Sequence, residues 1–253
     1  MTKEEQVFLK HLSDLQEAAW NRNIVTFSDF CGLNELNIFY SSRADFSSVK
    51  TVTSGGYDTA ERQMIAFIPD ALSYEWKFPI LAVNIRPLNA KFADVLTHRD
   101  YLGSLMNLGV DRSRIGDIAV MDNYSACVFC EEKLAGYLST ELTRVKHTSV
   151  VCTVSDPEEI SYTPKTEEIG GTVASVRLDS LIALAFHMSR SAVIPLIEGG
   201  RTFINGRLST SNGARLKEGD IISVRGQGRF FLGALEGTTK KGRQFVRLRR
   251  YVS

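Results

Sequence analysis

The sequence has few of the features that mark membrane, secreted or disulfide-stapled proteins. No apolar run approaches the roughly 18–20 residues that a membrane helix needs, and Lys3, Glu4 and Glu5 precede an amphipathic segment rather than a leader-like apolar one. Its 4 cysteines are not the framework of a disulfide scaffold in a chain of 253 residues. We therefore expect a soluble, cytoplasmic protein without a membrane partner.

Common catalytic and nucleotide-binding signatures are also missing. The sequence contains no P-loop, dinucleotide fingerprint, H-E-x-x-H motif or nucleophile elbow. The Gly-Gly pair at 55–56 lacks the length and the lysine of a phosphate-binding loop, so we interpret it as a turn. The R-L-D at 177–179 has the letters of the pseudouridine synthase tripeptide, but an apolar helix follows it directly. Asp179 or Ser180 is therefore interpreted as a helix cap, and we expect no cofactor.

Two other candidate sites have a structural alternative. Cys127 and Cys130 have the spacing of a metal or redox pair, but no second pair lies nearby and both fall inside a predicted strand. We interpret them as structural cysteines and expect no metal. His98, Arg99 and Asp100 begin a predicted helix, where they could form an acid–base cluster or simply face solvent. His98 and Arg99 could instead contact RNA phosphate. The residues proposed as a second RNA contact are His98, Arg99, Arg112 and Arg114.

Charge is distributed unevenly along the chain, although its net charge is only +1. Residues 1–170 carry 16 Lys and Arg against 24 Asp and Glu, a net charge of −8, whereas residues 171–253 carry 14 against 5, a net charge of +9. A basic segment of this kind predicts a module that binds polyanions. A basic tail that only aids solubility is the alternative, but these basic residues lie within helix-like and strand-like patterns.

Periodicity and turn signals predict an α+β protein. Residues 1–76 are expected to form a mixed α/β unit, 77–155 a central domain, 156–171 a linker rich in acids, prolines and glycines, and 172–253 a C-terminal domain. The central domain reads as strand, helix, strand, strand, helix, strand, which is the split βαβ arrangement of ferredoxin-like and RNA-recognition-like folds. It lacks the aromatic-rich strand of a typical RNA-recognition module, because Phe129 is the one aromatic in its strand 125–130.

The stretch from Arg177 to Arg207 predicts a small packed frame. Apolar positions at helical spacing indicate two short helices, with Ser189 as the cap of the second, and then a strand that ends in the tight-turn signal Asn205-Gly206. Arg177, Arg190 and Arg207 project from this frame. Because arginine forks pair with phosphate in a bidentate way, the frame favours a phosphate-binding surface.

Five motifs in residues 177–233 together resemble the RNA-binding module named after ribosomal small-subunit protein four, here called the S-four domain. They are R-L-D, S-R-S, G-G-R-T-F-I-N-G-R, L-K-E-G-D and I-S-V-R-G-Q-G-R-F. With further stretches at 55–62, 98–109 and 115–118, most of the chain is similar to the bacterial YlmH family. The resemblance implies a non-catalytic factor that binds ribosomal RNA and tRNA on the large ribosomal subunit. It also implies a role on stalled subunits that hold peptidyl-tRNA, in ribosome-associated quality control, and a link to cell division.

The resemblance also implies which residues contact RNA. Carried over residue by residue, the RNA contacts are Arg177, Ser189, Arg190, Ser191, Asn205, Gly206 and Arg207, with Lys217, Arg225 and Arg229 as neighbours.

Two alternative functions stay open, and we expect a monomer in solution. The first alternative is an RNA-modifying enzyme, with His98 and Asp100 as its best catalytic candidates. The second is an RNA-tethered scaffold that binds a protein partner.

Overall fold

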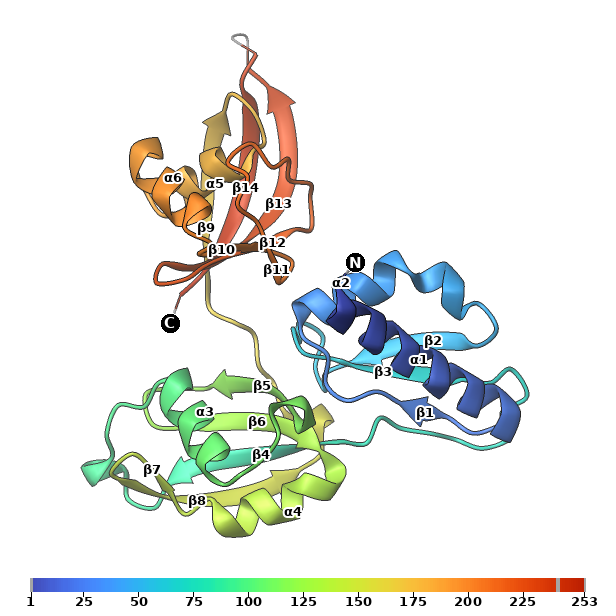
Figure 1. The fold of residues 1–253 in the computed structure, drawn as a ribbon. Coiled ribbons are helices and arrows are strands. Elements are labelled where there is room, and N and C mark those ends of the chain that lie inside the picture. Colours follow the sequence, from blue (N-terminus) through green and yellow to red (C-terminus); the bar gives the residue numbers. More distant parts are fainter. Residues whose placement is uncertain (1, 240–241, 253) are drawn as a thin grey trace. The chain divides into compact units, whose positions relative to one another are not determined.

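The computed structural model describes residues 2–239 and 242–252. Two compact units divide between Thr163 and Pro164, and each is described by itself (Figure 1). The first unit contains both the N-terminal block and the central sheet, and the second contains the basic C-terminal segment. The fold is α+β, with three antiparallel sheets.

The N-terminal block packs its helices against a three-stranded sheet of order β1-β3-β2. Helix α1 begins after Thr2, whose hydroxyl accepts a hydrogen bond from the Glu5 backbone N–H. Leu12, Phe39 and Phe67 are almost fully buried between the helices and the sheet. The elements are α1 (Lys3–Arg22), β1 (Thr26–Phe27), α2 (Leu33–Ser41), η1 (Arg43–Phe46), β2 (Lys50–Ser54) and β3 (Met64–Ile68).

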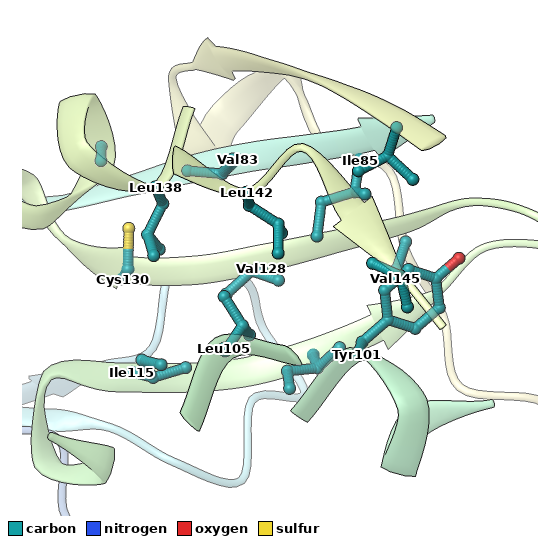
Figure 2. Packing of buried hydrophobic residues seen from close by; sticks show 14 of the residues in the cluster. Val83, Ile85, Tyr101, Leu105, Ile115, Val128, Cys130, Leu138, Leu142 and Val145 are labelled. Atoms are coloured by element: carbon teal, nitrogen blue, oxygen red, sulfur yellow. The ribbon is translucent and has the colours of Figure 1, made fainter. Parts of the chain in front are cut away.

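The central sheet has the order β5-β6-β4-β8-β7, with antiparallel neighbours throughout. Helices α3 and α4 supply Leu105 and Leu138 to a core on one face, where Val83 and Val128 of the sheet meet them (Figure 2). The elements are β4 (Ile80–Pro87), η2 (Ala90–Phe92), α3 (His98–Asn107), η3 (Arg112–Arg114), β5 (Ile115–Val120), β6 (Ala126–Glu131), α4 (Glu132–Glu141), β7 (Arg144–Val145), β8 (Thr148–Ser155) and η4 (Pro157–Glu159).

The order of the long elements is the one expected from the sequence, but the second helix is shorter. Helical spacing predicts a helix up to Val145, whereas α4 ends at Glu141. Leu142 and Val145 are still buried, because the chain turns there and β7 pairs with β8. Leu142 and Val145 thus have the spacing of helical residues and lie in the same core as α4, although they follow the end of that helix.

The N-terminal block covers the other face of the central sheet. Phe30 and Met64 pack there against Ile80, Cys127 and Phe129. Tyr57 stacks on Phe129 with ring centroids 4.8 Å apart.

The turn expected at residues 55–56 is present, and close packing requires its glycines. Gly56 has φ +95°, and a Cβ there would lie 2.6 Å from Cδ1 of Phe129. On β5 of the central sheet, a Cβ on Gly116 would lie 2.7 Å from Cε1 of Phe30 in the N-terminal block. Backbone and aromatic rings therefore approach closely on both sides.

The Asp117 carboxylate joins the N-terminal block to the central sheet. It accepts hydrogen bonds from the Tyr57 hydroxyl at 2.8 Å, the Glu61 backbone N–H at 2.7 Å and the Arg62 backbone N–H at 3.2 Å. The Arg62 guanidinium then donates to the carbonyls of Phe30 at 2.7 Å and Ile115 at 2.9 Å. The stretches 55–62 and 115–118, which carry part of the family resemblance, therefore meet at this junction.

The C-terminal unit has a six-stranded sheet of order β11-β10-β12-β13-β14-β9, with α5 and α6 packed on one face. Across the described residues, no single helix is long and apolar enough to cross a membrane; α5 and α6 reach that length and composition only as a pair bent by 119°. The elements are β9 (Thr166–Val173), α5 (Leu178–Ala185), α6 (Arg190–Glu198), β10 (Thr202–Ile204), β11 (Arg207–Leu208), β12 (Ile221–Val224), β13 (Gly228–Thr238) and β14 (Gln244–Tyr251).

The linker expected at 156–171 is a strand in its last part. Residues 166–171 belong to β9, which pairs with β14 from Tyr251 to Gln244. Two of the acids that give this segment a linker-like composition have basic partners on β14, since Glu167 pairs with Arg250 at 2.6 Å and Glu168 with Arg247 at 2.7 Å. Charge complementarity with a distant strand thus explains the acids at 167 and 168.

The junction around Asp117 gives a stability prediction. Asp117→Ala leaves two backbone N–H groups and the Tyr57 hydroxyl without their acceptor, so we expect a loss of about 3 kcal/mol in the free energy of unfolding. Chemical denaturation monitored by circular dichroism measures it. Asp58→Ala is the control, because Asp58 lies exposed near the same turn. Equal stability of the two variants would contradict the role assigned to Asp117.

Candidate nucleic-acid interface

A chain of hydrogen bonds at the start of α5 fixes the first predicted arginine. Arg177 donates from Nε to Oδ1 of Asp179 at 3.1 Å and from Nη2 to Oδ2 at 2.9 Å. Asp179 is only 5% exposed, and its Oδ1 also accepts from the Ser180 backbone N–H at 2.9 Å. The predicted cap at Asp179 or Ser180 is wrong, because the N-cap is Arg177. The carboxylate lies inside the first turn, where it orients the guanidinium.

The same chain reaches the second predicted arginine. Arg190 donates from Nη2 to the Ser180 hydroxyl at 2.9 Å, so Arg177, Asp179, Ser180 and Arg190 are connected from α5 to α6. Ser189 caps α6 as expected, accepting from the Ala192 backbone N–H at 3.3 Å. We call this set, with Ser189 and Ser191, the helix corner.

The exposed side of the helix corner offers hydrogen-bond donors. Ser189, Arg190 and Ser191 are all exposed, and the two serine hydroxyls lie 2.9 Å apart. The Arg177 side chain is 43% exposed in spite of its ion pair. Guanidinium N–H groups, hydroxyls and the N-terminal amides of α6 suit phosphate oxygens.

The hairpin between β10 and β11 holds the next group of predicted contacts. Asn205 and Gly206 have φ of 49° and 78°, as a two-residue turn of this type requires, and Ile204 pairs with Arg207. The Asn205 side chain is engaged inside the protein: it donates to Asp220 at 2.9 Å and accepts from the Ile221 backbone N–H at 2.9 Å. Asn205 therefore shapes the turn, whereas Arg207 is exposed at its end.

The remaining predicted contacts lie elsewhere in the C-terminal unit. Lys217 is exposed in the turn before β12. Arg225 lies over the ring of Phe203 at 4.8 Å, and Arg229 over the ring of Tyr251 at 4.9 Å. Phe203 and Arg229 lie on the sheet face opposite α5 and α6, because their strand neighbours Thr202 and Phe230 are buried in the core.

The expected second contact in the central domain divides into two pairs. His98 and Arg99 are exposed at the start of α3. Arg112 instead turns inward and donates to the carbonyls of Ile115 and Gly116, and burial beside Arg62 lowers its pKa to about 10. Arg114 is paired with Glu131 at 2.6 Å. The sequence could not show these acceptors, because a loop arginine looks the same whether it faces solvent or backbone.

Asp100 acts as a capping group for α3. Its carboxylate accepts from the Thr97 backbone N–H at 2.8 Å and from the Thr97 hydroxyl at 2.7 Å. These hydrogen bonds, with Lys146 3.3 Å away, hold the pKa of Asp100 below its usual range. An ionised, hydrogen-bonded carboxylate is a poor proton donor, which weakens the acid–base interpretation of His98 and Asp100.

Cys127 and Cys130 point to opposite faces of β6, so the two thiols cannot bind one metal ion. Cys127 belongs to the core under the N-terminal block and Cys130 to the core under α3 and α4. Burial raises the pKa of both thiols to about 12. Among the described residues, no group of three or more His, Cys, Asp or Glu side chains is placed to hold a metal ion.

Sequence reasoning missed two features of β14. Arg249 lies over the ring of Phe231 at 4.5 Å, which makes it a third stacked arginine beside Arg225 and Arg229. The apolar and basic residues of 244–252 predict a solvated Arg250, but Arg250 is partly buried and donates to the Ala185 carbonyl at 2.9 Å. Strict alternation along the strand would have separated Arg249 from Arg250, since adjacent residues face opposite sides.

Comparison with known proteins places this architecture in a class. A family model described as "Putative RNA-binding domain in YlmH" matches residues 75–159, which contain the central sheet with α3 and α4. The fold and this match define an α+β protein that carries such a domain.

Two relatives extend the likeness. "Ribosome-associated protein quality control protein P2" of Bacillus subtilis (strain 168) is 29% identical over 250 residues, covering 98% of this chain and 96% of that protein. The structure of "Cell division protein ylmH from Streptococcus pneumoniae" is similar in fold, with a TM-score of 0.50 and 18% identity, covering 63% of this chain and 95% of that one. The chain is thus similar to YlmH-family proteins, in the central domain by the family model and along nearly its whole length by the Bacillus subtilis relative.

The buried thiols give a prediction about reactivity and pH. Because the thiolate is the reactive form, native Cys127 and Cys130 should resist alkylation at pH 8 and react after denaturation. Their raised folded-state pKa leaves stability unchanged below the pKa of a free thiol, about 8.5, and lowers it as the pH rises from there toward 12. Mass spectrometry after timed alkylation measures this, with Ser47→Cys as an exposed control. Native Cys127 or Cys130 labelled at the control's rate would contradict the burial.

The helix corner gives a prediction about positioning. Asp179→Asn removes a negative charge from a basic region but weakens the hold on Arg177, so we expect RNA binding to become weaker, with a loss of about 1–3 kcal/mol in stability. Filter binding at fixed salt and chemical denaturation measure the two effects. Glu198→Gln is the matched control: Glu198 is an exposed carboxylate of the same unit, and it accepts a hydrogen bond from the Asn212 amide at 2.8 Å. Tighter RNA binding by both variants would mean that Asp179 acts only as a repelling charge.

Proposed function

We propose that this protein is a non-catalytic RNA-binding factor of ribosome-associated quality control. It docks on ribosomal RNA and tRNA of the large ribosomal subunit, on obstructed subunits that still carry peptidyl-tRNA, and works as a monomer in the cytoplasm. Similarity over 98% of the chain to a protein with a quality-control name supports the pathway. The match to an RNA-binding domain model supports the ligand class.

The helix corner is the observation that carries the RNA-binding proposal. Arg177 and Arg190 come from different helices, yet hydrogen bonds through Asp179 and Ser180 connect them before any ligand is present. A side chain that is already oriented loses less conformational freedom when it binds. Two oriented guanidinium groups beside the serines of the α6 N-terminus match the spaced phosphates of a folded RNA.

The domain assignments belong to the same proposal. The helix corner, the 205–206 hairpin and the strands from β12 onward lie in the region that resembles the S-four domain, which binds RNA. The central sheet order β5-β6-β4-β8 is that of a ferredoxin-like or RNA-recognition-like domain. Because the N-terminal block covers much of its helix-free face, we assign its RNA contact to His98 and Arg99 at the start of α3.

The contrasting hypothesis is an RNA-modifying enzyme, which would need a catalytic acid or a nucleophile. Its best candidate acid, Asp100, uses its carboxylate to cap α3 and to contact Lys146. The buried thiols have raised pKa values and so do not supply a nucleophile.

The proposal predicts a specific loss on mutation of the helix corner. Arg190→Ala should weaken binding to purified large subunits about ten- to a hundredfold, because a charge-assisted hydrogen bond contributes about 1.5–3 kcal/mol. The dependence of binding on salt should also become shallower, since one phosphate contact is lost. Co-sedimentation across a salt series measures both effects.

The control is Arg247→Ala, an exposed arginine of the same unit that is already paired with Glu168 and Glu236. Circular dichroism must show that both variants are folded. Undiminished co-sedimentation of folded Arg190→Ala would remove the helix corner from the RNA interface.

A further inference from the structure

The C-terminal sheet has a second basic surface, on the face opposite α5 and α6. Pairing registers align its side chains in rows across the strands. One row runs from Leu208 through Phe203 and Ser223 to Arg229. The next joins Ile221, Phe231 and Arg249 and ends at Glu168 of β9. We call this surface the outer sheet face; it is defined by Phe203, Phe231, Tyr251, Arg225, Arg229 and Arg249.

Each of the three arginines on the outer sheet face lies over an aromatic ring. The guanidinium carbons of Arg225, Arg229 and Arg249 are 4.8, 4.9 and 4.5 Å from the ring centroids of Phe203, Tyr251 and Phe231. A guanidinium held over a ring keeps its edge N–H groups available to anions and its outer plane available for stacking. Arg225 and Arg249 are exposed to solvent.

Charge on this face is concentrated at one end. Toward the middle of β14, Arg247 is held between Glu168 and Glu236, so its charge is neutralised locally. The row with Phe203, Ser223 and Arg229 contains no acidic residue. Arg225 and Arg249 therefore face solvent on this face, and the one carboxylate in register with Arg249, that of Glu168, is already paired with Arg247.

We propose that the outer sheet face binds an unpaired RNA segment, independently of the helix corner. This inference rests on the proposed function, because it gives the same RNA-binding unit a second contact. Unpaired bases stack on aromatic rings and arginine planes, whereas a duplex hides its bases and offers mainly phosphates. A flat face with stacked guanidinium planes fits the first ligand.

The two RNA-binding surfaces have different tasks in this arrangement. The helix corner holds the phosphates of a folded RNA, and the outer sheet face holds exposed bases next to it. Alternation along the strands and the packing of α5 and α6 on the inner face keep the two surfaces apart in one domain. A folded RNA with a loop or a free end supplies both ligands.

The test measures binding of the full chain to a fluorescent 12-nucleotide polyuridine by anisotropy, at several salt concentrations. The double variant Arg225→Gln with Arg249→Gln should bind at least about tenfold more weakly, since losing one base stack alone has an effect of that size. Arg249→Lys keeps the charge but not the planar group, so it should also weaken binding. The matched control is Arg247→Gln, on the same strand and face, and it should bind like the wild type.

Each outcome separates this inference from the proposed function. Arg190→Ala should keep most of its polyuridine affinity while losing affinity for large subunits. If the double variant and Arg247→Gln bind polyuridine equally, or if the wild type binds large subunits but not polyuridine, the outer sheet face is not an RNA site and the proposed function stands. If the wild type binds neither RNA, both proposals fail. Full polyuridine affinity in Arg249→Lys would mean that the outer sheet face binds RNA through charge alone, and would contradict base stacking on Arg249.

Discussion

A carboxylate removed from water has to be supplied with hydrogen-bond donors, and three aspartates of this protein organise their surroundings in that way. Asp117 gathers a tyrosine hydroxyl and two backbone N–H groups, and so fastens the N-terminal block to the central sheet. Asp179 holds the Arg177 guanidinium and the Ser180 N–H. Asp220 receives the Asn205 amide and the Lys217 N–H, and so fixes the hairpin relative to β12. Asp179, which belongs to a catalytic-looking tripeptide in the sequence, is thus part of the structural frame.

Predictions that depend on nearby residues were confirmed, whereas those that depend on distant partners were not. The cap at Ser189 and the turn at Asn205-Gly206 depend on neighbours within a few residues, and both are present. Arg112 donates to backbone carbonyls, and the acids of β9 pair with arginines that lie far away in the sequence. No local sequence pattern identifies either kind of partner. Alternation along β14 contained the information that Arg249 and Arg250 face opposite sides. The aromatic partner of Arg249 depends on strand register, which the sequence alone did not provide.

Net charge located the basic unit but not its available charges. Residues 171–253 carry a net charge of +9, yet Arg247 and Arg250 are neutralised by acids on β9 and β13. Arg177 is also paired, but its partner is buried and its own side chain remains partly exposed, so the pair orients it without hiding it. What distinguishes the helix corner and the outer sheet face is the geometry of a few arginines, rather than the total charge.

The covered face of the central sheet limits how this domain can meet RNA. In RNA-recognition modules, aromatic side chains on the helix-free face of the sheet stack on bases. Here Phe129 lies on that face, but the Tyr57 ring stacks on the Phe129 ring. Phe30 and Met64 pack in the same cluster and cover the rest of it. The part of the face that stays open is at β4 and β8, where Arg86 pairs with Val151 and both are exposed. RNA that reaches the helix-free face of the central sheet must therefore use this strip, because opening the rest would break the Asp117 junction.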